Sequence, residues 1–304
     1  MKQRRSVVER ESHKDSSSAQ RLPVLKTYKM YVDGKFPRSE SERYYAVRGS
    51  KGEAIANICS GSRKDFRDAL VSARKAQLSW ASRSAYNKAQ ILYRVAEMLE
   101  GRSAQFTDEL ILLGQSPKEA KWELEQAVDR LVYYAGWADK FQQLFSSVNP
   151  VNAPYFNFSV LEPVGVVCAF APPEFPLLGP VSAMAPLIAG GNTVVLVASE
   201  KKPLCAVTLG EVLQTSDLPA GVVNILTAKS LELTKTVATH MDLNGVWFAG
   251  SSASELRELE IGGAQNIRRI ARHTGVDWSE SSAQSPYMIT EMQEVKTTWH
   301  PVGV

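Results

Sequence analysis

Two short apolar runs decide the fold: residues 164–170 read VGVVCAF, and residues 193–197 read TVVLV. Both are nearly all apolar, which is typical of strands that are buried on both faces of a parallel sheet. Between them, residues 181–188 have helical patterning, and Gly190-Gly191-Asn192 ends that helix. A strand, a helix and a second strand in this order predict a βαβ unit.

The same alternation continues toward the C-terminus. Strands are predicted at 222–226, 245–248 and 267–270, and helices at 204–213, 231–239 and 253–261. This pattern predicts an α/β fold with a doubly wound, Rossmann-like parallel sheet. Such sheets bind ligands at the carboxyl ends of their strands.

Upstream, the pattern predicts short strands followed by helices. A hairpin is predicted at 30–36 around Asp33-Gly34, with strands near 44–47 and 55–59. Asp65 is predicted to cap the first helix, and Pro117 to open a helix that ends at Trp137. Residues 141–161 contain several Asn and Pro residues before an alternating run, which predicts a hairpin that leaves the domain body.

Composition excludes several classes of protein. The chain has 304 residues, with Lys+Arg 35 and Asp+Glu 32, a net charge of +3 that does not indicate a nucleic-acid binder. Three cysteines exclude a disulfide scaffold and favour a reducing, cytoplasmic location. No apolar run approaches 18 residues, so we expect no membrane span.

Five segments resemble, in the same order, segments of the NAD(P)-dependent aldehyde dehydrogenases. They are YYAGWADK at 133–140, EPVGVV at 162–167, AGGNTVV at 189–195, LPAGVVNIL at 218–226 and FAGS at 248–251. The resemblance runs from about Tyr31 to Ile270 and implies the cofactor-binding domain of that family.

The resemblance also implies which catalytic groups to look for, and the sequence departs from them. Residues 172–176 read PPEFP where the family has PWNFP, so Glu174 stands where an asparagine would hold the oxyanion. Residues 270–277 do not contain the LELGGK segment of the general base, and the nucleophile's FxNxGQxC string does not occur in the chain. We therefore predict no catalytic residue.

For the cofactor, the resemblance implies a weak or vestigial NAD(P) site. Val197 stands where the family has a ribose-binding lysine, while Glu200 matches a glutamate near the same ribose. Gly250 and Ser251 match the turn that meets the pyrophosphate at a helix N-terminus. The alternative is that these residues serve only the turn and the helix cap.

The remaining chemical side chains predict no further site. Cys59, Cys168 and Cys205 are expected to be structural, with Cys168 a neutral thiol inside a buried strand. The four histidines, expected at the surface, have no metal-ligand spacing, so no metal site is predicted: His13, His240, His273 and His300.

The predicted organisation has four parts. Residues 1–22 form a disordered leader, 23–272 the cofactor-type domain, 273–286 a linker replacing the catalytic domain, and 287–304 a C-terminal oligomerisation strand. That last segment resembles the YTEVKTVW-type tail of the family, a strand that crosses to a neighbouring subunit. The arrangement resembles the shortened, non-catalytic second half of two-part (family 16) aldehyde dehydrogenases.

Three functional hypotheses follow from the sequence. The first is a non-catalytic subunit that assembles with itself or with a full-length aldehyde dehydrogenase, with Tyr287 and Trp299 either as interface anchors or as core residues. Because its edge strands would be exposed in a lone monomer, we expect the tail to pair with another chain. The second is an NAD(P)-dependent oxidoreductase with an unrecognised nucleophile. The third is a nucleotide-binding regulator.

Overall fold

A five-stranded parallel sheet forms the centre of the molecule, as the sequence predicts. The computed structural model describes residues 24–49 and 52–303, so the predicted leader at 1–22 and His13 lie outside it. The strand order is β10-β9-β6-β7-β8, and every neighbouring pair is parallel. The strands are β6 (Val166–Phe170), β7 (Thr193–Val197), β8 (Val223–Leu226), β9 (Gly245–Phe248) and β10 (Arg269–Arg272).

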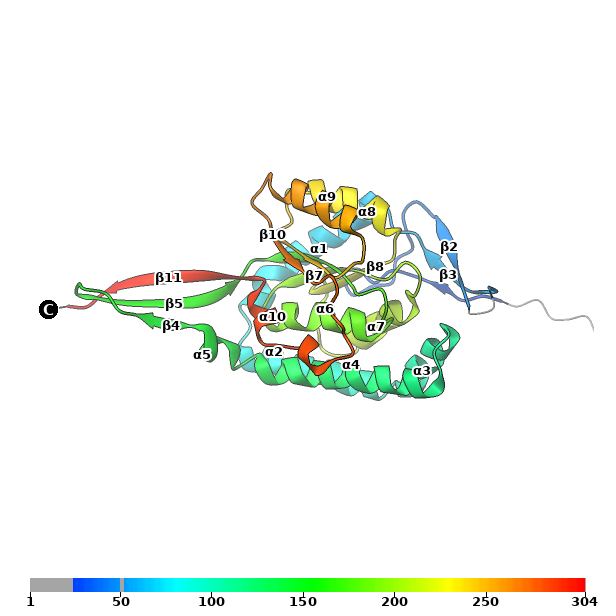
Figure 1. Ribbon diagram of the computed structural model, residues 1–304, viewed down its shortest axis with the longest axis horizontal. Coiled ribbons are helices and arrows are strands. Elements are labelled where there is room, and N and C mark those ends of the chain that lie inside the picture. Colours follow the sequence, from blue (N-terminus) through cyan, green and yellow to red (C-terminus); the bar gives the residue numbers. More distant parts are fainter. Residues whose placement is uncertain (1–23, 50–51, 304) are drawn as a thin grey trace, which may run out of the picture.

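Helices cover both faces of this sheet (Figure 1), and four of its strands are accordingly buried along their whole length. On one face, Val167 and Leu196 pack in a core with helices α6 (Leu178–Ala189) and α7 (Leu204–Gln214). On the other face, Cys168 and Val195 pack with α1 (Arg63–Ala81), α8 (Ser230–Thr239) and α9 (Ala253–Gly263). Since neither strand face meets water, the period-two alternation of a half-buried strand is lost.

A second helical layer lies outside α6. It consists of α2 (Ala85–Glu100), α3 (Ser103–Leu112) and α4 (Pro117–Trp137). The predicted bounds of α4 are confirmed. The predicted capping role of Asp65 is confirmed in part: Ser62 is the N-cap, and Asp65 is the third helical residue, whose carboxylate accepts the Ser62 N–H at 2.8 Å in a capping box. None of the helices among the described residues combines the length and apolar character that a membrane crossing requires.

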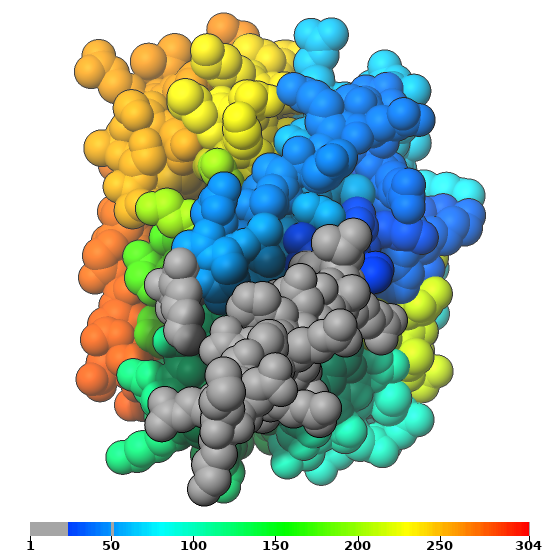
Figure 2. All heavy atoms as spheres, turned by 90° about the vertical axis from the view of Figure 1, so that its right-hand side faces the viewer, coloured from blue at the N-terminus to red at the C-terminus, as the bar shows by residue number. Residues whose placement is uncertain are grey.

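A small three-stranded sheet, β1 (Thr27–Tyr28), β2 (Tyr44–Arg48) and β3 (Ala54–Cys59), lies at one end of the body. Figure 2 shows this end, with the sheet in blue. The predicted 30–36 hairpin is only partly present. Asp33 and Gly34 form a turn with positive φ, closed by one bridge between Val32 and Lys35, but Tyr31 pairs with Ile225 of β8 instead.

At the opposite end, an antiparallel three-stranded ribbon extends away from the body (Figure 1). It contains β4 (Ser147–Asn149), β5 (Tyr155–Pro163) and β11 (Gln293–Pro301), in the order β11-β5-β4, and follows the short helix α5 (Phe141–Phe145). We call these three strands the ribbon. All nine residues of β11 pair with β5 of the same chain, and β11 is an edge strand of the ribbon, so the pairing of its other edge with another chain stays a prediction. The tail also begins with a short helix, α10 (Tyr287–Thr290), rather than a strand.

The segment 273–286 packs into the body although its sequence is polar. Trp278 is 2% exposed, and His273 is 6% exposed, so the surface prediction for His273 is wrong. The His273 ring lies 4.3 Å from the Trp247 ring and 5.9 Å from the Trp278 ring. Its Nε2 is 2.9 Å from a carboxylate oxygen of Glu291. This contact links the residue after β10 to the segment just before β11. His240 is half-buried and His300 is exposed.

Candidate functional site

A pocket of about 420 Å³ opens at the carboxyl ends of β6, β7 and β9. The strand order reverses between β6 and β9, which is the switch point where doubly wound sheets hold ligands. Apolar strand ends and polar loop residues share the lining: Phe170, Ala171, Pro173, Glu174, Val197, Ala198, Ser199, Glu200, Lys201, Ser230, Gly250, Ser251, Ser252 and Glu255.

The three residues that the sequence proposes for a cofactor all line this pocket. Glu200 follows β7 and is exposed, while Gly250 and Ser251 follow β9 and precede α9. A Cβ on Gly250 would come within 2.7 Å of the Phe248 ring, so this turn requires glycine. The tertiary structure therefore brings Glu200, Gly250 and Ser251 together from two strand ends.

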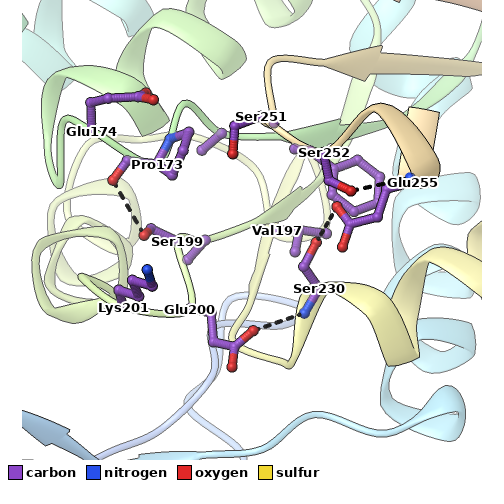
Figure 3. Close-up of a pocket in the computed structure, with 14 residues that line it drawn as sticks. Pro173, Glu174, Val197, Ser199, Glu200, Lys201, Ser230, Ser251, Ser252 and Glu255 are labelled. Atoms are coloured by element: carbon purple, nitrogen blue, oxygen red, sulfur yellow. Dashed lines mark hydrogen bonds between the residues drawn. The ribbon is translucent and has the colours of Figure 1, made fainter. Parts of the chain in front are cut away.

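Ser230 joins two carboxylates inside the pocket (Figure 3). Its hydroxyl donates to Glu255 at 3.0 Å, and its backbone N–H donates to Glu200 at 3.4 Å. Glu255 is buried in the first turn of α9. Burial raises the pKa of Glu255, the Ser230 hydrogen bond opposes this, and the nearby charges of Glu200 and Glu258 raise the pKa further.

Sequence reasoning missed Ser230, Ser252 and Glu255. The spacing Ser252-x-x-Glu255 is a helix N-terminus signal that could have identified the start of α9. The Ser252 hydroxyl does accept the Glu255 N–H at 3.3 Å. The Glu255 carboxylate, however, bonds to Ser230 on another helix, which the local pattern does not indicate.

Hydrogen bonds from two parts of the chain position the loop at residues 172–176, which reads PPEFP, and the residues just after it. The Ser199 hydroxyl donates to the Pro173 carbonyl at 3.4 Å, and Glu174 is exposed at the pocket. After the loop, the backbone N–H groups of Leu177 and Leu178 donate to Glu123 of α4 at 2.8 and 3.0 Å. Burial raises the pKa of Glu123, which these hydrogen bonds partly offset. The donors at the start of α6 are thus occupied by the chain's own carboxylate.

All three cysteines are buried and free, and none lines the pocket, as expected for structural thiols. Burial raises the pKa of Cys168, and burial with the nearby Glu109 raises that of Cys205. A thiol in this state is a poor nucleophile. Within the ranges that the structure covers, no group of three or more His, Cys, Asp or Glu side chains is arranged to hold a metal ion.

Comparison with known proteins identifies the family. The model of the aldehyde dehydrogenase family matches residues 36–296. The chain belongs to the aldehyde dehydrogenase family. The motifs found in the sequence and the strand-end pocket therefore have a common origin with those of this family.

Individual relatives agree with this assignment. The chain is 31% identical over 257 residues to retinal dehydrogenase 2 of Gallus gallus, covering 83% of this chain and 49% of that protein. It is 28% identical over 256 residues to omega-crystallin of Enteroctopus dofleini, covering 83% and 51%. The NAD+ complex of an aldehyde dehydrogenase from Bacillus cereus matches with a TM-score of 0.77 and 26% identity, covering 82% of this chain and 51% of that chain. The chain thus spans about half the length of the relatives it matches.

The residues present do not fit the pyrophosphate of the family's dinucleotide. Glu255, in the first turn of the helix that would face a phosphate, and Glu174, on the loop after β6, both place carboxylates at the lining. Val197, where the resemblance implies a lysine, is buried and apolar. Like charges at these positions would repel a phosphate rather than bind it.

Proposed function

We propose that this chain is a non-catalytic member of the aldehyde dehydrogenase family that assembles with itself or with a catalytic aldehyde dehydrogenase. The observation that carries this proposal is an apolar stripe on one face of the ribbon, formed by Val148, Phe156, Phe158 and Val160. Phe156, Phe158 and Val160 alternate along β5, and Val148 pairs with Phe158. Val148 is 67% exposed and Phe156 is 46% exposed.

The opposite face of the ribbon carries a small network of polar side chains. Asn149 donates to Asn157 at 2.6 Å and to Ser159 at 2.9 Å, and the Ser159 hydroxyl lies 2.8 Å from the Thr297 hydroxyl. The apolar stripe has no such internal partner in the ribbon, and exposed apolar patches mark interaction surfaces. A stable interface of this kind buries about 1,600 Å² in total.

Two exposed aromatic residues lie outside the apolar stripe, since Trp299 pairs with Asn157 and therefore shares the opposite face of the ribbon. Trp299 and Tyr287 are both exposed, so the core-packing alternative for them is wrong. Trp299 packs edge-on against Tyr155 at the ribbon, and Tyr287 against Phe145 of α5. We assign both as anchors for the partner, because aromatic side chains supply large contact areas at interfaces.

The non-catalytic part of the proposal is supported by the buried thiols and by Glu174 on the pocket loop. The finer assignment to the second half of a two-part (family 16) aldehyde dehydrogenase is supported by a tail strand, β11, that pairs with β5 in a chain with a cofactor-type body. Three free thiols are consistent with a reducing cytoplasm.

Light scattering with size-exclusion chromatography tests the assembly. We expect the chain to form an oligomer, alone or with a catalytic aldehyde dehydrogenase, and the double variant Phe156→Ser/Phe158→Ser to lose it. Tyr44→Ser, which changes an exposed aromatic residue on the small N-terminal sheet, is the matched control and should leave the assembly unchanged. A monomeric chain that captures no catalytic relative would contradict the proposal, as would aldehyde oxidation that is abolished by a single Cys→Ser change.

The second candidate is an NAD(P)-dependent oxidoreductase. It is favoured by the position of the pocket at the sheet's switch point, with Glu200 and Ser251 at its lining. It requires a phosphate to bind beside Glu255. Isothermal calorimetry that measures micromolar NAD binding, together with aldehyde-dependent NADH formation, would establish this candidate instead.

A further inference from the structure

One edge of β11 is open. β11 (Gln293–Pro301) is the outer strand in the ribbon order β11-β5-β4, and it pairs with β5 along its whole length. Among the residues that the structure covers, no strand pairs with its other side, which we call the free edge. The outward-pointing N–H and C=O groups of an edge strand are a template for another strand. At about 3.4 Å per residue, this template is about 31 Å long.

One carboxylate of β11 has an unfavourable neighbour inside the ribbon. Glu294 lies directly opposite Glu162 of β5, and like charges at such positions are destabilising. The Lys296 ammonium bonds to Glu162 at 2.9 Å, which offsets only one of the two negative charges. A hydrogen-bond donor that approached Glu294 from the free edge would therefore stabilise the strand.

The sequence of β11 is complementary to itself when two copies run antiparallel. Because both copies direct the same alternate set of backbone groups toward the free edge, residues that lie opposite each other are an even number of positions apart in the sequence. The register that pairs all nine residues is centred on the middle one, Thr297. It places Glu294 opposite His300 of the second copy, whose ring N–H can donate to the carboxylate. It also places Val295 opposite Trp299, and β-branched and aromatic side chains stabilise each other across strands.

The side chains that this register joins are accessible. Val295 is 68% exposed and Trp299 is 58% exposed. Glu294 and His300 are exposed as well. The Trp299 ring packs edge-on against the Tyr155 ring at 5.9 Å, which orients it before a second copy arrives. An oriented aromatic side chain loses less entropy on binding than a free one.

Two residues of the kinds that discourage pairing at an edge do not obstruct this register. Lys296 is drawn toward Glu162 and would face the neutral Thr298 of the second copy. Pro301 has no N–H, but it is the last residue of the strand, so it removes at most the last bond of the ladder. A register centred on Lys296 would instead place two ammonium groups opposite each other, which is destabilising.

We infer that two copies of this chain pair through their free edges, antiparallel about Thr297, and join two three-stranded ribbons into one six-stranded sheet. This inference rests on the assembly proposed above and specifies its partner, a second copy, and its register. The two-fold axis is perpendicular to the sheet, so the two apolar stripes lie on the same face. Because each ribbon extends away from its own body, the two bodies lie at opposite ends of the shared sheet (Figure 1).

Disulfide trapping in the full chain tests the register. Thr297→Cys brings two thiols together at the two-fold axis, while the three native cysteines are buried. After oxidation with oxidised glutathione, we expect at least ten times more disulfide-linked dimer from Thr297→Cys than from Val295→Cys. Val295→Cys is the matched control on the same face, because its two copies lie about 14 Å apart along the strands. A mixture of Val295→Cys and Trp299→Cys should cross-link at least ten times more than either variant alone.

Exchange of the charged pair tests the same register without a new thiol. Glu294→His places two imidazoles opposite each other and should raise the dimer dissociation constant about fivefold, since the lost pair occurs twice in the dimer. Adding His300→Glu restores the pair in reverse order and should return the constant to within about twofold of the unchanged chain. Glu125→His, at an exposed carboxylate of α4, is the matched control. Analytical ultracentrifugation measures all four proteins.

The outcomes separate this inference from the assembly on which it rests. If light scattering shows an oligomer but Thr297→Cys cross-links no more than Val295→Cys, the pairing of free edges is overturned and the assembly stands. A chain that is monomeric alone but captures a catalytic aldehyde dehydrogenase leads to the same conclusion. If Thr297→Cys cross-links while Phe156→Ser/Phe158→Ser leaves the oligomer unchanged, the edge pairing stands and the apolar stripe is not the surface that holds the assembly.

Discussion

The body and the ribbon of this molecule are held together in opposite ways. In the body, β6 and β7 are buried along their whole length between two layers of helices. In the ribbon, buried residues alternate with more exposed ones along the middle of β5, and the buried side carries the polar Asn157 and Ser159 beside Leu161. The body is stabilised mainly by apolar burial, and the ribbon mainly by its backbone hydrogen bonds and a small polar network.

This difference shows which part of the molecule can stand alone. In the body, helices cover both faces of the central sheet, whereas the Val148–Phe156–Phe158–Val160 stripe of the ribbon has no layer packed over it within the part of the chain that the structure describes. Isolated antiparallel strands are marginally stable without a packed face. The body should therefore unfold as one cooperative unit, while the ribbon should open locally unless a partner covers its stripe.

The largest difference between the body and the ribbon should be in the rate at which their cysteine thiols react. Cys59, Cys168 and Cys205 all lie in the body and are buried. With an unfolded fraction of about 10⁻³ or less, their reaction with Ellman's reagent should be at least ~10³-fold slower than for an unfolded thiol. A thiol introduced by Val148→Cys in the ribbon should react at once. Fast labelling of a native cysteine would show that the body opens more readily than its packing implies.

Removing apolar volume from the central sheet should have the next largest effect. Leu196→Ala in β7 should lower the free energy of unfolding by about 2–5 kcal/mol, because it leaves a cavity between the sheet and α6. Leu231→Ala on the exposed side of α8 is the matched control and should change it by less than about 0.5 kcal/mol. Urea unfolding measures both. Equal losses for the two variants would be incompatible with a body held by apolar burial.

Breaking the polar network should loosen the ribbon alone. Asn157→Ala removes the acceptor of the Asn149 amide and should reduce the protection of ribbon amides from hydrogen exchange by about 1 kcal/mol. Amides of β6 and β7 should keep their protection. Thr298→Ala, on the other face of the same ribbon, serves as the control. If exchange in the body rises as well, the two regions are coupled and the contrast between them is incorrect.

The smallest effect should be a pH dependence from a buried carboxylate of the body. Burial raises the pKa of Glu109, while hydrogen bonds from Thr208 at 2.7 Å and Tyr28 at 2.8 Å lower it, so the net rise is moderated. A raised native pKa means that the native state binds more protons than the unfolded state, whose Glu titrates near about 4.3. Stability should therefore fall as pH increases from about 4.3 through the native pKa.

Glu109→Gln removes this titration. Urea unfolding of the unchanged chain and of the variant, measured between about pH 4.5 and 7.5, should give a stability difference that shifts in favour of Glu109→Gln as pH increases. Because Glu123 and Glu255 are present in both proteins, their own titrations cancel in the comparison. A stability difference that does not change with pH would mean that Glu109 has the same pKa in the native and the unfolded state.

Local sequence patterns were sufficient for most elements of the body. The apolar runs at 164–170 and 193–197 predicted buried parallel strands. A strand with one face in water alternates apolar and polar residues, whereas a strand covered on both faces does not. Pro117 and the Ser116–Glu119 capping pair mark the start of α4, since both satisfy the first turn of a helix locally. The burial of Cys168 also follows from its apolar neighbours in the strand.

Other features depended on segments that are distant in the sequence. Tyr31 pairs with Ile225, β11 pairs with β5, and Glu255 bonds to Ser230, and no local periodicity distinguishes these partners from alternatives. The polar segment around His273 and Trp278 is buried for the same reason, because the space it fills is formed by Trp247 of β9.

The sequence by itself thus determined the family, the alternation of strands and helices, and the candidate residues Glu200, Gly250 and Ser251. Only the tertiary structure decided that the tail strand pairs with β5 of the same chain and that the Glu255 carboxylate meets the Ser230 hydroxyl at the pocket. The physical reason is that side-chain periodicity reports which face of an element is buried, whereas the partner across that face is set by the packing of the whole chain.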